Sequence, residues 1–172
     1  MSQGWGAEAF NTGHVALIKA FRCATTGNTW DDEVERWIRS AAIPWVADES
    51  RADMDRRLLL LFDGLGNLAG IAAHELRDAI AAGVDGSFVV RHLTAIAVGV
   101  DWQATSIPRS GRVSDVLMST TLSDINSRPQ SVGFVNAFIH EGNPRSRALF
   151  ARNGFVAYPP AIQGYLRNAL TM

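Results

Sequence analysis

Cysteine and lysine are nearly absent from this sequence, and each absence excludes something. The chain of 172 residues contains a single cysteine, Cys23. One cysteine cannot form an intrachain disulfide, so we expect a reducing, cytoplasmic setting. No Cys–His signature surrounds Cys23, and a free cysteine usually packs as a small apolar residue, which favours burial over a role as nucleophile. Lysine is limited to Lys19, so the positive charge is almost all arginine, which suits bidentate contacts to phosphate or carboxylate.

Long apolar runs and an excess of charge of one sign are also missing. No stretch approaches the roughly 18 apolar residues of a membrane span, and the N-terminal residues lack the basic-then-apolar pattern of a secretory signal. The formal net charge is -1, from 16 Lys and Arg against 17 Asp and Glu. We therefore expect no membrane partner, and nucleic acid is a disfavoured partner unless a local basic patch exists.

What is present fits one ordinary globular domain over residues 1–172. Hydrophobic residues make up 47% of the chain and charged residues 19%. A chain of this length buries roughly 70% of its unfolded surface without disulfides or metals, and we predict no metal site. Residues 1–13 are small and polar, with Gly4, Gly6 and Gly13, and predict a loose lead-in.

The first half of the chain changes pattern several times. Residues 14–24 are apolar and fit a strand or a helix equally well. Apolar residues recur every three or four positions over 30–42, which predicts a helix that Pro44 ends. A charged loop at 47–56 precedes a hairpin with turn chemistry at 63–67. The hairpin strands are predicted at 58–62 and 68–76, followed by a short helical turn within 77–86.

Strands and helices alternate in the second half. A long Val-, Ile- and Ala-rich run predicts a central strand over 88–100, and after the loop at 101–111 we predict a helix over 112–126. A buried strand at 132–139 follows. The last predicted elements are a helix from Asn143-Pro144 to Gly154 and a strand at 155–158. This alternation implies an α/β sheet with at least one parallel crossover.

The segment NPRSRALFARNGF carries a family resemblance. Its pattern of Asn143, Ala148, Phe150, Gly154 and Phe155 resembles the last motif of the GNAT N-acetyltransferases. A well-capped helix that docks through its apolar side would explain the same residues without any function.

Two further features extend the resemblance over about residues 58–158. The hairpin, with Gly70 after its turn, is similar to the second and third strands of the family. The long strand and its Arg/Gly loop fall where the family keeps its acetyl-CoA site. The resemblance implies a GNAT fold, with a central mixed, mostly antiparallel sheet flanked by helices.

The strand–loop–helix segment 92–118 is the candidate cofactor site. A helix that starts after a Gly-containing loop presents unpaired N–H groups to an anion, although any such connection uses glycine and polar residues. The resemblance implies that the pantetheine arm of acetyl-CoA lies along the strand and its pyrophosphate on the loop, with Asn143 also at the cofactor. The implied cofactor-binding residues are Ile96, Ala97, Val98, Arg109, Ser110, Gly111, Arg112, Val113 and Ser114. The loop departs from the family pattern at Arg112 and Ser114, and Gln103 is another plausible start.

Acetyl transfer to an amine needs a base, because the nucleophile must be neutral. His92 matches the place of the family's base on the central strand, and an ordinary hydrogen-bonded strand histidine is the alternative. Glu75 and His140 are further base candidates; His74 faces the side opposite Glu75. The family's usual acid, a tyrosine, is replaced by Phe150, which leaves Ser146, a water or unaided thiolate departure.

These residues predict an acetyl-CoA-dependent N-acetyltransferase with direct transfer in a ternary complex. The acceptor could be a small molecule, a protein amine or an aminoacyl-tRNA, and a homodimer is compatible with the sequence. Trp30, Trp37 and Trp45 would either border the acceptor cleft or pack in the core. A non-catalytic GNAT-like domain that binds a CoA-type ligand or a protein partner is the alternative.

Overall fold

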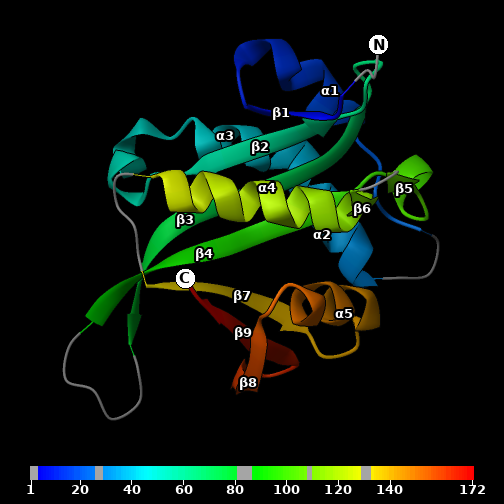
Figure 1. Ribbon diagram of the computed structural model, residues 1–172. Helices are drawn as coiled ribbons and strands as arrows, with labels where there is room; N and C mark the ends of the chain where they lie inside the picture. The colour runs from blue at the N-terminus through cyan, green and yellow to red at the C-terminus, as the bar shows by residue number, and fades with distance from the viewer. Residues whose placement is uncertain (1–3, 26–28, 81–86, 108–109, 129–132) are drawn as a thin grey trace.

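The computed structural model describes residues 4–25, 29–80, 87–107, 110–128 and 133–172. A seven-stranded sheet in the order β1-β2-β3-β4-β7-β9-β8 runs through the molecule (Figure 1). Its strands are β1 (Gly6–Ala9), β2 (Arg57–Phe62), β3 (Leu68–Ile80), β4 (Ser87–Val98), β7 (Phe134–His140), β8 (Val156–Ile162) and β9 (Tyr165–Thr171). A separate two-stranded sheet is formed by β5 (Ser106–Ile107) and β6 (Gly111–Arg112).

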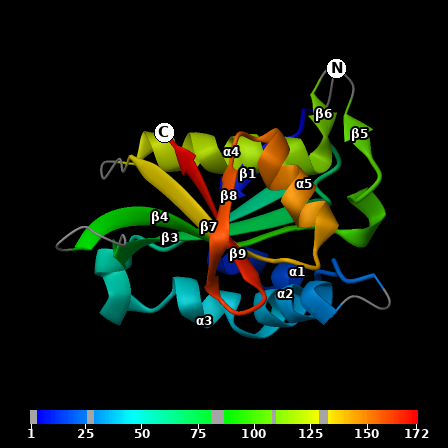
Figure 2. The same cartoon turned by 90° about the horizontal axis from the view of Figure 1, so that it is seen from below.

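Helices cover both faces of the large sheet (Figure 2). One face carries α1 (Val15–Ala20), α2 (Thr29–Ser40) and α3 (Ala42–Val46), and the other carries α4 (Val113–Ser127) and α5 (Pro144–Arg152). Each face has its own apolar core, one around Ile38 and Ile71 and the other around Met118 and Ile139. Among the described residues, no helix is long and apolar enough to cross a membrane.

The strand pairing confirms the predicted α/β class and the mixed, mostly antiparallel sheet. Among the described residues, every pair of neighbouring strands in the large sheet is antiparallel except β4 with β7. The helix α4 makes the crossover between these two parallel strands, as the alternating pattern of the second half predicts.

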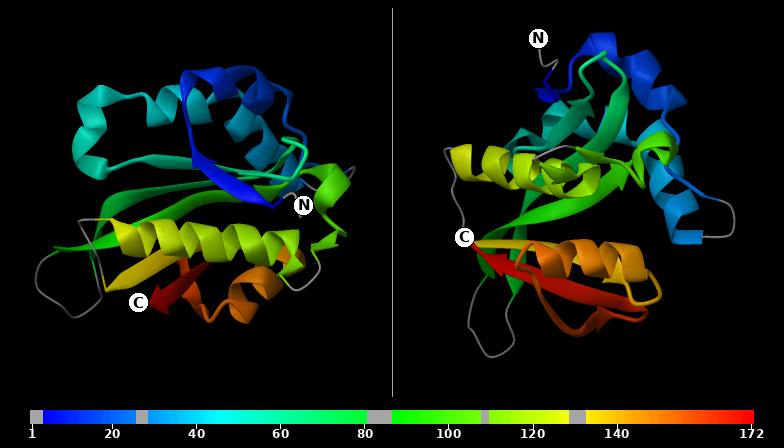
Figure 3. Two further views of the ribbon diagram at one scale, coloured as in Figure 1. Left: turned by 45° about the horizontal axis from the view of Figure 1, so that its top comes forward. Right: turned by 45° about the vertical axis from the view of Figure 1, so that its right-hand side comes forward.

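The sheet opens where β4 and β7 stop pairing. Their parallel ladder covers only Arg91–Leu93 on β4 and Val135–Ala137 on β7. Directly afterwards, a register shift against β3 leaves Thr94 as an extra residue in β4, because Leu93 faces His74 and Ala95 faces Ala73. Such a bulge bends and twists the strand, and β4 and β7 separate toward their C-terminal ends (Figure 3).

Several predicted elements are confirmed. The helix predicted at 112–126 is α4, the strand at 132–139 is β7, and the hairpin is β2–β3. The last predicted helix is α5: the Asn143 side chain accepts from the Ser146 amide, Pro144 occupies the first turn, and Gly154 has φ 85°.

The prediction of a loose lead-in over 1–13 is wrong in part, because Gly6–Ala9 pair with Leu59–Phe62 as an edge strand. The segment GAEA lacks the β-branched residues that signal a strand, so its extended form comes from the neighbour it pairs with. Residues 14–24, left open between strand and helix, contain the short helix α1.

Two other boundaries differ from the prediction. The helix predicted over 30–42 is α2, which ends at Ser40, before Pro44. Helical structure then resumes in α3, and Pro44 lies in its first turn, where no residue needs an intrahelical N–H partner. The short helical turn within 77–86 is wrong up to Ile80, since β3 continues through that residue, and the remainder lies outside the described residues. Residues 165–171 form β9, a strand that the sequence analysis did not assign.

Candidate active site

A cleft of about 380 Å³ lies where β4 and β7 separate. Its walls come from the end of β4, the start of α4, one side of α5 along its length and the start of α2. Six of the predicted cofactor-binding residues line it: Ile96, Ala97, Val98, Arg112, Ser114 and Asn143.

The edge of β4 offers main-chain groups to this cleft at alternate residues. The Gly99 amide donates to the Ala69 carbonyl at 2.9 Å, and Ala97 is register-paired with Ile71. Because successive residues of a strand point their N–H and C=O groups to opposite edges, Gly99 and Ala97 face β3 while Ile96 and Val98 face the open side. Ile96 and Val98 are therefore the residues whose backbone a ligand in the cleft could reach.

The start of α4 only partly resembles the predicted phosphate loop. The Val113 amide donates to the Thr105 carbonyl at 3.3 Å and the Ser110 amide donates to Ile107 at 3.0 Å, so both are already engaged. Gly111, with φ 85°, is the first residue of β6 and pairs with Ile107 of β5. Arg112 and Ser114 line the cleft, whereas Arg109 lies outside the described residues. Side chains and the amides after Val113 are the groups left for an anion.

The helix α5 adds two cationic groups that sequence analysis missed. Arg145 and Arg152 line the cleft together with Arg112. Asp31 is the one carboxylate among the described residues that line it, and Arg152 also pairs with Asp115 of α4 at 3.0 Å. Positions 145, 148, 149 and 152 share one side of a helix, so the helical spacing of NPRSRALFAR contained a signal for both arginines.

Polar side chains cross the cleft. Arg145 pairs with Asp31 of α2 and donates to the Gln103 Oε1 atom at 3.0 Å. The Gln103 Nε2 atom donates to the Cys23 carbonyl at 2.6 Å and to the Val98 carbonyl at 3.2 Å. Asp31, Gln103 and Cys23 all belong to the lining.

His92 lies on β4, two residues before the bulge, and is only 5% exposed. Its Nδ1 atom is 2.8 Å from the Asn136 Oδ1 atom, an arrangement in which Nδ1–H donates and Nε2 keeps the lone pair. Burial first, and then the charge of Arg77, lowers the pKa of His92 to about 4. The imidazole is therefore neutral at pH 7. It packs against the Phe138 ring at 5.4 Å and is absent from the described lining of the cleft.

Glu75 faces His92 across the β3–β4 ladder and is 1% exposed. Its carboxylate is paired with Arg56 at 3.0 Å and with Arg77 at 2.5 Å. The adjacent His74 projects to the other face of the sheet, where its Nε2 atom lies 3.0 Å from Asp124 on α4. Neither Glu75 nor His74 is among the described residues that line the cleft.

His140 ends β7 near the cleft entrance, beside Asn143, whose amide donates to its carbonyl at 2.9 Å. The ring stacks on Trp30 at 5.0 Å and meets Tyr165 edge-on at 5.2 Å. The Gly142 amide donates to Nδ1 at 3.0 Å, so in the neutral ring the proton is on Nε2. His140 thus presents an N–H donor, and its lone pair is occupied.

The predicted acid position holds no proton donor. Phe150 is 2% exposed and packs edge-to-face on Phe155 at 4.8 Å, so it belongs to the core. Ser146, the substitute considered from the sequence, lines the cleft. A further hydroxyl lies at the bulge: the Thr94 Oγ1 atom is buried and has no partner among the described residues.

The three tryptophans considered for the acceptor cleft lie in two different environments. Trp37 and Trp45 meet edge-on at 5.5 Å and pack against the core under α1–α3, whereas Trp30 lies against His140. Cys23 is 5% exposed and burial raises the pKa of its thiol to about 12, which fits the predicted packing role.

Comparisons of sequence and of structure give different results. No protein-family profile matches the chain, and no curated protein matches it significantly. Solved structures do match. A GNAT-family acetyltransferase from Streptococcus pneumoniae superposes with a TM-score of 0.63 at 13% identity, over 98% of this chain and 100% of that one.

Two other solved structures are similar to the same extent. The Campylobacter jejuni N-acetyltransferase PseH, solved with acetyl coenzyme A, gives a TM-score of 0.58 at 14% identity over 98% of this chain and 99% of that one. A variant of the spermidine N-acetyltransferase SpeG from Vibrio cholerae gives 0.60 at 15% identity over 97% and 93%. At such identities the likeness is one of fold.

Proposed function

This chain has the GNAT fold, and from that premise we propose that it is an N-acetyltransferase that uses acetyl-CoA. The observation that carries the proposal is the cleft between the separated strands β4 and β7, which combines a free strand edge with three arginines. The acetyl group would pass directly to a small-molecule amine in a ternary complex.

The cleft suits both halves of the cofactor. Coenzyme A carries three phosphate groups at one end, and Arg112, Arg145 and Arg152 supply guanidinium groups that bind phosphate well. The amide-bearing pantetheine arm would pair with Ile96 and Val98, whose backbone groups face the open edge, as an added strand does. A PseH structure was solved with acetyl coenzyme A, which supports this choice of cofactor.

The thioester would lie at the point where the two strands part. Thr94 is there, next to the described lining of the cleft, and its buried hydroxyl has no partner in the part of the chain that the structure describes, which costs stability unless a ligand supplies one. A hydroxyl at this position can donate to the carbonyl oxygen as it becomes an oxyanion. We assign the thiolate no protein acid, because Phe150 has no proton to give, and thiolates leave readily near neutral pH.

His92 is the base that the geometry supports best. Its Nε2 lone pair is available, whereas the lone pair of His140 accepts from Gly142 and the carboxylate of Glu75 is held by two arginines. Since His92 is buried beside the cleft, the proton of the amine would reach it through a water.

The acceptor would approach the thioester from the side of α2. Trp30, His140 and Tyr165 form an aromatic wall there, between α2 and the β7–β9 strands. Aromatic faces attract cations, and this suits an amine that arrives as an ammonium ion. A spermidine acetyltransferase is among the similar structures, which supports a small-molecule acceptor without naming it.

A non-catalytic CoA-binding domain is the second candidate, and the observation in its favour is Phe150 in place of an acid. Calorimetric titration with CoA, followed by thiol release from acetyl-CoA with a panel of primary amines, separates the candidates. Binding with amine-dependent thiol release supports the enzyme. Binding without turnover on a broad panel supports the binding domain, and no heat at millimolar CoA contradicts both.

A further inference from the structure

A side-chain amide of the protein itself lies in the cleft, at the position proposed for the pantetheine arm of the cofactor. Gln103 lies in the connection between β4 and α4, and its Nε2 atom donates to the carbonyls of Val98 and Cys23 at 3.2 and 2.6 Å. The Val98 carbonyl belongs to one of the two residues whose backbone faces the open edge of β4. Gln103 therefore occupies a hydrogen-bond acceptor that an added strand would need.

The other end of the Gln103 side chain is held across the cleft. Its Oε1 atom accepts from the Arg145 guanidinium of α5 at 3.0 Å. The other terminal nitrogen of Arg145 is paired with Asp31 of α2 and also lies 3.5 Å from the Thr25 hydroxyl. A continuous polar chain thus joins α2, α5 and the edge of β4, and its three members Asp31, Arg145 and Gln103 all line the cleft.

We propose that Gln103, held by Arg145 and Asp31, is an internal competitor that occupies the pantetheine position and must leave before coenzyme A can bind. This inference rests on the proposed function, since it concerns the same cleft. A primary carboxamide and the secondary amides of pantetheine offer the same N–H donor. The Val98 carbonyl is therefore matched equally well by either, and the two compete for it.

The competition lowers the apparent affinity for the cofactor. If only the fraction of molecules with Gln103 displaced can bind, the observed dissociation constant rises by the inverse of that fraction. Displacement breaks the contact to Val98, the contact to Cys23 and the charged contact from Arg145. Removing the amide should therefore tighten CoA binding roughly three- to tenfold.

The test is a titration of CoA by calorimetry at fixed ionic strength. Gln103→Met keeps the length of the side chain and removes both amide atoms, so it should bind CoA roughly three- to tenfold more tightly than wild type. Gln163→Met, at an exposed glutamine in the β8–β9 turn, is the matched control and should bind like wild type. A thermal melt of each variant verifies that it is folded.

A double-mutant cycle separates the competitor from a simple charge effect. Asp31→Asn frees Arg145 and should also tighten binding, but it removes a negative charge from the cleft as well. If Asp31 acts through Gln103, the double variant Gln103→Met/Asp31→Asn gains no more than Gln103→Met alone. A fully additive gain would show that Asp31 acts by its charge, and would remove it from the proposal.

The remaining outcomes each decide a question. Unchanged affinity in Gln103→Met overturns the competitor, and weaker binding makes Gln103 a ligand of the cofactor instead. Should Gln103→Met fail to fold, Gln103→Leu serves in its place, because it also lacks both amide atoms and leaves the charge of the cleft unchanged. Absence of CoA binding in wild type and in every variant contradicts the proposed function itself.

Discussion

Single residues decide which groups of the candidate site can move a proton. His92 and His140 are both candidates for the base from the sequence alone, but their hydrogen bonds differ. The Nδ1 atom of His92 lies against Asn136 Oδ1, whereas Nδ1 of His140 accepts from the Gly142 amide. In the neutral ring of His92, the Nε2 lone pair is therefore available, whereas in the neutral ring of His140 the lone pair on Nδ1 is already used.

A substitution at His92 tests this assignment. His92→Gln keeps a polar side chain of similar reach but removes the base, so turnover should fall roughly 10²- to 10⁴-fold, with CoA affinity unchanged. In wild type, the pKa of about 4 keeps the imidazole neutral above pH 5. Protonation of His92 should therefore reduce turnover only as the pH falls toward 4, and should contribute no change between pH 6 and 8.

The measurement is thiol release as a function of pH for both proteins, with acetyl-CoA saturating. His140→Gln is the comparison: it removes part of the proposed acceptor wall but no available lone pair, so it should change the KM for the amine and not the dependence of turnover on pH. Equal turnover in His92→Gln and wild type would remove His92 from the reaction.

Long-range contacts mark the limit of sequence analysis at the scale of residues. The Asn143 cap and the Gly154 end of α5 are local, and both could be predicted. The pairing of Arg145 with Asp31 spans 114 positions, and the contact of Gln103 with Cys23 spans 80. No local pattern specifies such partners, since they meet only after the sheet has brought α2 and α5 to the same cleft.

At the scale of elements, the packing of α4 on the sheet depends on one small residue. Gly70 lies on β3 beneath α4, and a Cβ atom there would be 2.9 Å from the Leu117 Cδ2 atom and 3.2 Å from the Ala97 carbonyl oxygen. The leucine terminus could move, but the Ala97 backbone belongs to the β3–β4 ladder and cannot. The glycine after the hairpin turn thus allows the helix to approach the sheet closely.

We therefore expect Gly70→Ala to destabilise the fold by roughly 1–3 kcal/mol, as other overpacking substitutions do. Chemical denaturation measures the change. Gly6→Ala is the control, because nothing lies within 4 Å of a Cβ atom at Gly6 and its backbone is extended; it should be neutral or slightly stabilising. Equal stability of Gly70→Ala and wild type would contradict the close approach.

Elements with strong local signals were predictable, and those that depend on neighbours were not. The helix α4 and the hairpin β2–β3 follow from their own periodicity and turn residues. The strand β1 has no such signal and exists because Leu59–Phe62 offer it a partner. The end of α2 before Pro44 was predictable, whereas the short helix α3, whose first turn tolerates this proline, was not.

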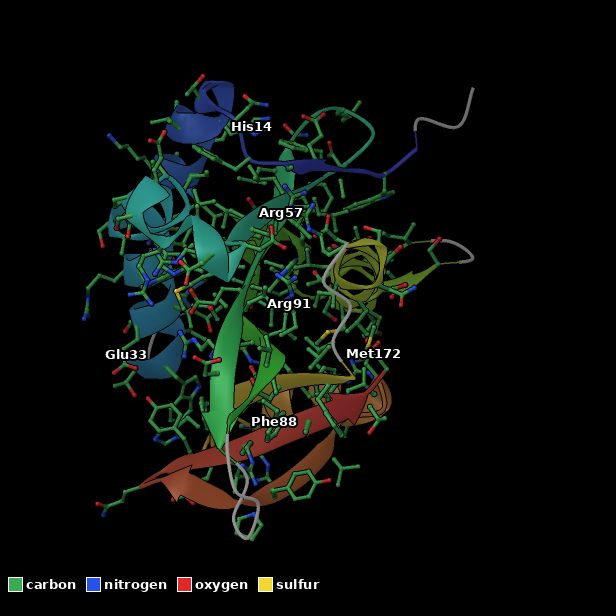
Figure 4. The ribbon with its side chains drawn as sticks, turned by 90° about the vertical axis from the view of Figure 1, so that its left-hand side faces the viewer. His14, Glu33, Arg57, Phe88, Arg91 and Met172 are labelled. Atoms are coloured by element: carbon green, nitrogen blue, oxygen red, sulfur yellow. The ribbon has the colours of Figure 1, made fainter. Side chains whose placement is uncertain are left out.

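At the scale of the whole molecule, the sheet and the helix α4 are held together by buried ion pairs as well as by apolar packing. Arg91 of β4 is 0% exposed and pairs with Asp55 at 2.9 Å; Arg128, which caps α4, pairs with the same carboxylate. A second cluster joins Asp124 of α4 to His74 and Arg57 of the sheet. Arg57 and Arg91 lie in the layer between the sheet and α4 (Figure 4).

These carboxylates should make the fold sensitive to acid. Burial alone would raise the pKa of Asp55, but the hydrogen bonds from Arg128 and Arg91 lower it overall. The hydrogen bond with His74, and then Arg57, lowers the pKa of Asp124. A carboxyl with a pKa below its unfolded value, about 3.9, stabilises the fold above that value and loses the contribution as the pH falls through the folded pKa. Urea midpoints should therefore fall steeply below about pH 4.

Asp55→Asn isolates the charge at this junction, because asparagine also tolerates the left-handed backbone that Asp55 adopts at φ 43°. The substitution leaves Arg91 buried without a counter-charge, so the free energy of unfolding at pH 7 should fall by roughly 3–5 kcal/mol. The exposed Asp53→Asn is the matched control and should change it by less than about 0.5 kcal/mol. The difference between wild type and Asp55→Asn should shrink as the pH falls below about 4 and through the lowered pKa of Asp55, where folded wild type also loses the carboxylate. A difference that stays constant down to pH 2 would show that the carboxylate charge is not what joins α4 to the sheet.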